Sequence, residues 1–211
     1  MSALRGPGLD PFYPILDSAA WIARLLPHGI RLVQLRAKDL PPEIIHKEIV
    51  EARDLCAAAG AQLVVNDWWR EAIATGCDYV HLGQEDLDDA DIPAIRRAGL
   101  RLGLSTHDDD ELERALRLDP DYVALGPIYP TRLKAMRFAP QGLEKIGEWK
   151  RRCGRIPLVA IGGLSVERVD AVLAAGADAA AVVTDITLGA DPEARTRAWA
   201  SATRRDEVAA H

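Results

Sequence analysis

The chain has 211 residues, of which 48% are hydrophobic and 27% are charged, and its formal net charge is −6 at pH 7. A chain of this length can bury about 70% of its unfolded surface, so we expect one domain. The acidic total argues against nucleic acid as the main partner, and no apolar run approaches the ~20 residues that cross a membrane.

Residues 1–11 contain a Gly-Pro-Gly segment, which predicts a flexible N-terminal arm ahead of one folded domain over residues 12–211. The start of the chain lacks the basic segment and apolar core of a secretion signal. The odd number of cysteines, without metal-type spacing, favours structural roles and a cytoplasmic location. These cysteines are Cys56, Cys77 and Cys153.

Short β-rich runs alternate with helical stretches along the chain. The predicted strands are 12–17, 32–38, 62–67, 79–83, 101–106, 122–127, 157–163 and 179–185. The predicted helices include 42–59, 109–118, 141–152, 166–175 and 192–203. Several helices finish in Ala-Gly, as at Ala59-Gly60, Ala98-Gly99 and Ala175-Gly176. Serial βα units in a chain this short predict a single compact (β/α)₈ TIM barrel.

A doubly wound open sheet is the alternative topology. We consider it less favourable because the strand count suits closure, and because no Gly-x-Gly-x-x-Gly turn follows the first strand.

The second predicted strand ends in polar side chains. With a two-residue period, Gln34, Arg36 and Lys38 would point to one side and Leu35 to the other. Arginine binds phosphate oxygens through its planar fork, and lysine supplies a compact charge. The pattern therefore favours a site for a phosphate ester, the alternative being a solvated strand edge.

Carboxylates follow the third and fourth predicted strands. Asn66-Asp67 ends the third strand, and Asp86 lies in the loop after the fourth. Two carboxylates opposite a phosphate-binding wall favour Mg²⁺, which prefers oxygen ligands. Helix capping is a plausible alternative for Asp67, and less so for Asp86, because Asp88, Asp89 and Asp91 are nearby capping candidates.

The later strands also end in residues suited to anions. Ser105-Thr106-His107 ends the fifth strand, and His107 lies before an acidic run typical of a helix start. Thr131 and Lys134 follow the sixth strand, and Thr184 ends the eighth. Gly162-Gly163 ends the seventh strand, where barrels commonly bind phosphate, although an ordinary turn would also explain two glycines.

Together these segments closely resemble thiamine phosphate synthases, and they run in family order from the second strand to the eighth. The segments are Gln34-Leu-Arg-x-Lys38, Asn66-Asp67, Val80-His-Leu-Gly-Gln-Glu-Asp86, Gly103-Leu-Ser-Thr-His107, Gly126-Pro-Ile-Tyr-Pro-Thr131 through Lys134, Ala160-Ile-Gly-Gly163 and Ala181-Val-Val-Thr184. The resemblance implies a Mg²⁺-dependent transferase that joins hydroxymethylpyrimidine diphosphate to hydroxyethylthiazole phosphate. The products would be thiamine phosphate and pyrophosphate, formed by a dissociative substitution.

The resemblance also assigns roles to individual residues. It implies that Arg36, Lys38 and Lys134 hold the diphosphate, and that Asp67 and Asp86 bind Mg²⁺. The remaining expected substrate-binding residues are Gln34 and Asn66 at the pyrimidine end, Ser105 and Thr131 as hydrogen-bond donors, and Gly163, Val183 and Thr184 at the thiazole phosphate. Arg36, Lys38, Lys134 and Ser105 are the expected catalytic residues.

One position departs from the family pattern. The loop after the sixth strand usually contains Thr-x-Thr-Lys, and here Leu133 replaces the second threonine. A lost hydrogen bond to a charged oxygen would weaken binding by about 1.5–3 kcal/mol, and Arg132 or Arg137 could compensate with charge.

Two other functions remain open from the sequence. A thiazole tautomerase of the same fold would use His107 as acid and base, and a non-catalytic barrel would only bind thiamine intermediates. The sequence leaves homo-oligomer formation undetermined.

Overall fold

The computed structural model describes residues 9–131 and 138–204, and its centre is a closed ring of parallel strands. The strands are β1 (Phe12–Leu16), β2 (Leu32–Leu35), β3 (Gln62–Asn66), β4 (Tyr79–Leu82), β5 (Arg101–Thr106), β6 (Tyr122–Leu125), β7 (Leu158–Ile161) and β8 (Ala179–Val182). Each strand pairs with the next in sequence, and β8 pairs with β1. The predicted (β/α)₈ barrel is thus confirmed.

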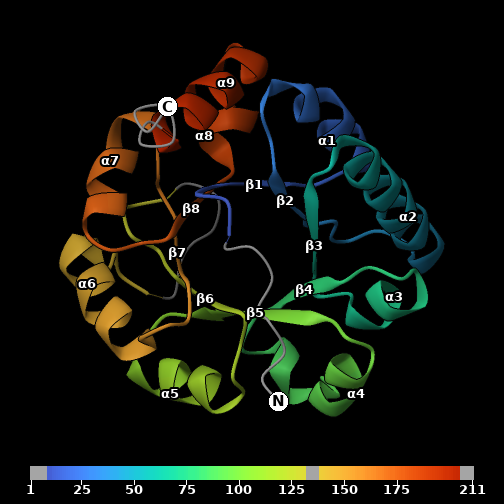
Figure 1. The fold of residues 1–211 in the computed structure, drawn as a ribbon, viewed down its shortest axis with the longest axis horizontal. Coiled ribbons are helices and arrows are strands. Elements are labelled where there is room, and N and C mark those ends of the chain that lie inside the picture. The colour runs from blue at the N-terminus through green and yellow to red at the C-terminus, as the bar shows by residue number, and fades with distance from the viewer. Residues whose placement is uncertain (1–8, 132–137, 205–211) are drawn as a thin grey trace.

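Helices surround the ring of strands (Figure 1). They are α1 (Ala19–Leu25), α2 (Pro42–Ala59), α3 (Trp69–Ala74), α4 (Ile92–Arg97), α5 (Asp109–Arg117), α6 (Gly142–Cys153), α7 (Val166–Ala174), α8 (Thr184–Thr187) and α9 (Pro192–Thr203), with short 3₁₀ turns at Leu26–His28 and Asp86–Asp88. Within residues 9–131 and 138–204, no helix has the length and apolarity to cross a membrane.

Most strands are shorter than the sequence predicts. β2 ends at Leu35 rather than residue 38, and β8 ends at Val182, so that Thr184 begins α8 instead of ending a strand. The polar ends of the predicted strands are therefore loops, where side chains reach solvent or a ligand. The Ala-Gly prediction is confirmed, because the glycines after α2, α4 and α7 all have positive φ.

The last residues of the predicted N-terminal arm are attached to the barrel. Asp10 accepts a hydrogen bond from the backbone N–H of Phe12 at 3.0 Å and pairs with Arg204 at 2.8 Å. Residues 1–8 lie outside the described residues, so the flexible arm remains a prediction there.

The core has two layers. Side chains that point outward from the strands pack against the helices, and the alternate side chains fill the barrel interior. The interior includes large aromatic residues, among them Tyr13, Tyr79 and Tyr122. Such hydroxyl-bearing rings need hydrogen-bond partners when they are buried.

The three cysteines are free and buried. Burial raises the pKa of Cys56 to about 12 and that of Cys153 to about 11. Both thiols therefore stay protonated near neutral pH, as expected for structural cysteines.

Gly103 makes room for the Tyr122 ring, which lies opposite it in the β5–β6 register. A Cβ atom at Gly103 would lie 2.1 Å from a carbon of that ring. We expect Gly103→Ala to lower the free energy of unfolding by about 1–3 kcal/mol, because the packed interior has no space to accept a methyl group.

Gly147→Ala is the matched control, because Gly147 lies within α6 and its added Cβ would meet nothing closer than 3.5 Å. This control should stabilise the chain by about 0.5–1 kcal/mol. Denaturant unfolding measures both variants, and equal stability of the two would contradict the packing argument.

Candidate active site

The candidate residues gather at one end of the barrel. In a closed parallel barrel, the carboxyl ends of all strands surround one opening, which we call the mouth. The segments after β2, β3, β4, β7 and β8 carry candidate residues to this end, and Ser105 lies in β5. The loop after β6 carries Thr131, whereas Lys134 and Leu133 lie outside the described residues.

Opposite charges meet between the β2, β3 and β4 ends. The Nζ atom of Lys38 lies 2.8 Å from Oδ2 of Asp67. Burial raises the pKa of the Asp86 carboxyl, and the nearby negative charge of Asp67 raises it further, while Lys38 opposes this effect. Lys38, Asp67 and Asp86 thus bring two carboxylates close to one ammonium group. We call these three residues the acidic cluster.

The backbone around Asp67 holds its carboxylate toward the mouth. Asp67 has a φ of 64°, in the left-handed region that Asp and Asn tolerate better than most residues. Its backbone N–H donates to the carbonyl of His81 at 2.9 Å. The capping alternative is not supported, because the N-cap of α3 is Trp68 and no side chain caps that helix.

Local hydrogen bonds hold the loops that carry the cluster. The indole of Trp68 donates to the carbonyl of Ala37 at 3.0 Å, which ties the β3 loop to the β2 loop. Asp86 accepts a hydrogen bond from the N–H of Gly83 at 2.9 Å. Capping of α4 comes instead from Asp91, which leaves the Asp86 carboxylate at the mouth.

The polar residues after β2 lie at different depths. Arg36 and Lys38 are exposed, and no carboxylate among the described residues pairs with the Arg36 guanidinium. Gln34 is only 2% exposed and lies inside the barrel, like the nearly buried Asn66. The predicted alternation is confirmed, because Leu35 and Ala37 pack in the outer layer while Gln34 lies on the inner side. The three β2 residues differ in depth, since Gln34 is still within the strand and Arg36 and Lys38 follow it.

A buried chain of hydrogen bonds runs beneath the mouth, and sequence reasoning missed most of its members. Gln34 Nε2 donates to Tyr13 Oη at 3.0 Å, and the two tyrosine hydroxyls of Tyr13 and Tyr122 lie 2.9 Å apart. Tyr122 Oη lies 2.7 Å from His81 Nδ1, and His81 Nε2 lies 2.8 Å from Ser105 Oγ. The chain ends at Ser105, a predicted catalytic residue.

His81 is neutral near pH 7, because burial lowers its pKa to about 4. Its ring stacks on Tyr122 with centroids 5.4 Å apart. The sequence does contain a signal that His81 points inward, because the two-residue period of β4 gives Tyr79 and His81 the same direction.

The glycine pair after β7 has a packing role. A Cβ atom on Gly163 would lie 2.5 Å from the carbonyl oxygen of Pro130, and its φ is 66°. The neighbouring Gly162 accepts a hydrogen bond from the N–H of Tyr129 at 3.0 Å. Close approach of the β6 loop alone therefore requires glycine at 163, whether or not a phosphate binds there.

The start of α8 is held firmly at the mouth. Val183 is the N-cap of this short helix and Thr184 its first residue. Asp185 pairs with Arg195 at 2.8 Å and accepts a hydrogen bond from the Trp199 indole at 2.7 Å. These contacts attach α8 to α9 and so position the backbone of Val183 and Thr184.

His107 lies beside the end of the β6 loop. Its Nδ1 lies 2.7 Å from Glu111, and its ring stacks on Phe138 with centroids 4.7 Å apart. Asp108 caps α5, as the acidic run predicts. Both contacts give His107 a structural position between α5 and the loop that carries Lys134.

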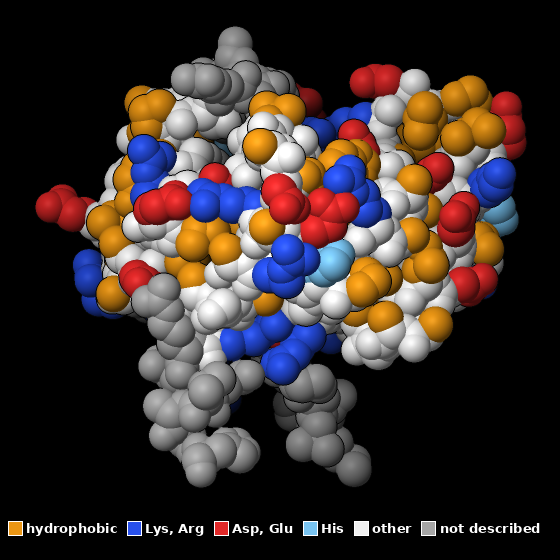
Figure 2. Space-filling view, turned by 90° about the horizontal axis from the view of Figure 1, so that it is seen from above, with side chains coloured by type: hydrophobic (Ala, Val, Ile, Leu, Met, Phe, Trp, Pro, Cys, Tyr) orange, Lys and Arg blue, Asp and Glu red, His pale blue; other side chains and the backbone are white. Residues whose placement is uncertain are grey.

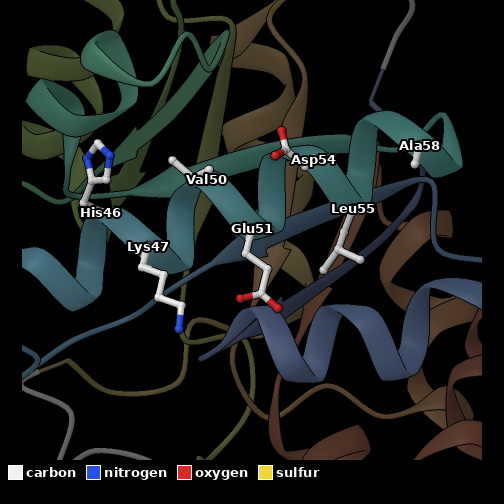
Figure 3. A pocket seen from close by; sticks show the side chains of 7 residues that line it. All are labelled: His46, Lys47, Val50, Glu51, Asp54, Leu55 and Ala58. Atoms are coloured by element: carbon white, nitrogen blue, oxygen red, sulfur yellow. The ribbon is translucent and has the colours of Figure 1, made fainter.

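A shallow hollow on α2 (Figure 3) involves no predicted site residue and is lined by His46, Lys47, Val50, Glu51, Asp54, Leu55 and Ala58. Figure 2 shows acidic and basic side chains interspersed on one face of the molecule. That face lacks the broad basic surface that nucleic-acid binding proteins usually present.

Fold and site together define a (β/α)₈-barrel enzyme whose mouth carries charged groups of both signs. The protein-family model described as thiamine monophosphate synthase matches residues 12–186. The chain therefore belongs to this family, and it is a transferase.

Individual relatives agree with this assignment. The thiamine-phosphate synthase of Rhizobium etli is 63% identical over 92% of this chain and 96% of its own length. That of Neisseria meningitidis serogroup B is 47% identical over 89% of this chain and 92% of its own. The structure of thiamine phosphate pyrophosphorylase from Pyrococcus furiosus has a TM-score of 0.82 and 25% identity, over 93% of this chain and 96% of that one.

Proposed function

We propose that this chain joins hydroxymethylpyrimidine diphosphate to hydroxyethylthiazole phosphate, giving thiamine phosphate and pyrophosphate. The observation that carries the proposal is the acidic cluster at the mouth, together with the Arg36 guanidinium, which pairs with no carboxylate among the described residues. The names of relatives up to 63% identical support the same reaction. The match of motifs from β2 to β8 supports it along nearly the whole barrel.

Cationic side chains would bind the diphosphate. Arg36 offers a planar pair of donors to its oxygens, and Lys38 offers a mobile charge that is now paired with Asp67. Lys134, outside the described residues, is proposed as the third cation. Because these groups interact most strongly with the departing pyrophosphate, they would stabilise the transition state more than the bound substrate.

The acidic cluster fits Mg²⁺. Asp67 and Asp86 offer carboxylate oxygens, and they lie so close together that the charge of Asp67 helps to raise the pKa of Asp86. The residues described contain no group of three or more metal-ligating side chains, so phosphate oxygens and water would complete the coordination. When bound, Mg²⁺ would neutralise charge on the diphosphate and make it a better leaving group.

The organic parts of the substrates would lie between these groups and α8. Gln34 and Asn66 would orient the pyrimidine, and Ser105 and Thr131 would donate hydrogen bonds near the diphosphate and the thiazole. The backbone of Gly163, Val183 and Thr184 would bind the thiazole phosphate. The carbon–oxygen bond to the diphosphate would break first, and the thiazole nitrogen would then supply the electron pair of the new carbon–nitrogen bond.

The alternatives have less support. A tautomerase would leave the acidic cluster and Arg36 without a role, and His107 Nδ1 is already engaged by Glu111. A non-catalytic barrel does not agree with membership of a transferase family. A cytoplasmic location remains a prediction, and a homo-oligomer remains compatible with the sequence.

An assay of pyrophosphate release tests the proposed reaction. With Mg²⁺, we expect pyrophosphate and thiamine phosphate to form in equal amounts only when both substrates are present. Conversion of the thiazole phosphate alone, without pyrophosphate, would favour the tautomerase. Stoichiometric binding of both substrates without turnover would favour the carrier.

A further inference from the structure

The buried chain of hydrogen bonds from Gln34 to Ser105 joins two proposed substrate contacts through the barrel interior. Its three middle members, Tyr13, Tyr122 and His81, are all less than 10% exposed. Ser105 is partly exposed at the mouth end. Because the Ser105 end lies where substrate would bind, the direction of the hydrogen bonds affects what the Ser105 hydroxyl can offer a ligand.

The placement of Gln34 sets this direction. Its Nε2 atom can only donate, so Tyr13 Oη accepts and must send its own hydrogen elsewhere. The hydroxyl of Tyr122 lies 2.9 Å away and is the acceptor for that hydrogen. The Tyr122 hydroxyl then has its own hydrogen to donate, and His81 Nδ1 lies 2.7 Å from it.

The hydrogen bond from His81 to Ser105 has the same direction of donation. Its ring is buried, and both ring nitrogens face neutral hydroxyl groups, so it is held as a neutral imidazole with one hydrogen. Because Nδ1 accepts from Tyr122, the hydrogen lies on Nε2 and is donated to Ser105 Oγ. The hydroxyl hydrogens of Tyr13 and Tyr122 and the ring hydrogen of His81 then all have acceptors.

The opposite direction conflicts with the position of Gln34. If His81 carried its hydrogen on Nδ1, Tyr122 would donate to Tyr13, which already accepts from Gln34. The Tyr13 hydrogen would then have no acceptor within the chain, although the residue is only 1% exposed. An unpaired buried hydroxyl is unfavourable, so the first arrangement is preferred.

We propose that Tyr122 and His81 are positioning residues that make Ser105 an acceptor inside the barrel and thereby a donor toward the substrate. Diphosphate oxygens only accept hydrogen bonds, so they are bound best by a hydroxyl whose own hydrogen is not already used. The role in turnover rests on the proposed function. The direction of the hydrogen bonds is a property of the protein alone and can be measured without substrate.

Nitrogen NMR of the intact protein tests the direction. With ¹⁵N-labelled histidine, two-bond correlations within each ring show which nitrogen carries the hydrogen, and His81 is assigned through its bonds to the backbone. We expect the Nε2–H form in the unsubstituted protein. The Nδ1–H form, which would follow if Gln34 turned its Oε1 toward Tyr13, or a charged ring would overturn the proposal.

Two matched variants extend this measurement. Tyr122→Phe removes the donor to His81 Nδ1, so we expect a mixture of the two ring forms. Tyr13→Phe removes a hydroxyl from the same edge-on aromatic pair but leaves Tyr122 to donate to His81, so the Nε2–H form should persist. Equal responses in the two variants would contradict the assigned direction.

Kinetics test whether the chain acts through Ser105. We expect Tyr122→Phe to lower turnover about tenfold, and to add little in a Ser105→Ala background, because the two changes remove the same donated hydrogen bond. Thermal unfolding checks that both variants remain folded. If the two substitutions lowered turnover independently, so that their effects multiplied, the positioning role would be overturned. An inactive unsubstituted protein would instead count against the proposed function and leave the NMR result intact.

Discussion

Replacement of Arg36 by alanine should reduce turnover about 100-fold to 1000-fold while the fold stays intact. The side chain is exposed at the mouth, and no carboxylate among the described residues pairs with it, so its removal disturbs little packing. A charged donor aimed at a leaving group contributes about 2.7–4 kcal/mol to the transition state, which gives the stated loss. Steady-state measurement of pyrophosphate release reports the rate.

Two further variants make the Arg36 result specific. Arg97→Ala removes an exposed arginine from α4, on the outside of the barrel, and should leave the rate unchanged. Arg36→Lys keeps the charge but loses the planar fork, so an intermediate rate is expected. If Arg36→Ala were as active as Arg97→Ala, the diphosphate would not bind beside β2.

The second large effect is expected from Asp67→Asn. Asparagine has nearly the same size and also tolerates the left-handed backbone at this position, so the change removes mainly charge. Loss of a magnesium ligand should lower the rate about 100-fold at low Mg²⁺, with partial recovery as Mg²⁺ is raised. Rates measured over a range of Mg²⁺ concentrations test this expectation.

A titration without substrate separates this effect from misfolding. The charge of Asp67 raises the pKa of the Asp86 carboxyl, so that pKa should fall in Asp67→Asn, as followed by carbon NMR. Asp89→Asn, an exposed residue close in sequence to Asp86, is the control and should change neither quantity. An unaltered Mg²⁺ requirement in Asp67→Asn would show that the carboxylates hold no metal.

The sequence predicts the barrel well because each strand carries its own signal. Period-two alternation and the Ala-Gly helix end are local patterns, and they suffice to place β5 and α2 with the bounds that the structure shows. The strand ends are predicted less accurately. After Leu35, Ala37 is still buried in the outer core layer, and the backbone N–H of Arg36 still donates to the carbonyl of Leu16 in β1 at 2.8 Å, although β2 itself ends at Leu35.

The charged part of the site is more predictable than its buried part. Lys38, Asp67 and Asp86 could be brought together from sequence because the ends of neighbouring parallel strands meet. Tyr13, Tyr122 and His81 look like ordinary core residues in isolation. Their hydrogen bonds depend on how strands distant in sequence are staggered around the barrel, which local patterns do not encode.

In the β6 loop, the structure describes only part of the predicted site. Thr131 lies within the described residues, whereas Lys134 and the unusual Leu133 do not. Their roles in holding the diphosphate therefore remain predictions. Gly163 shows the opposite situation, because its contact with Pro130 explains the glycine without reference to a ligand.

The most direct test is a crystal structure with Mn²⁺ in place of Mg²⁺, together with pyrophosphate and thiamine phosphate. The anomalous signal of manganese locates the ion independently of the protein. We predict an ion held by Asp67 and Asp86, with pyrophosphate contacting Arg36 and the phosphate of the product at Gly163 and Thr184. An ion or pyrophosphate bound away from these carboxylates and from Arg36 would contradict the account.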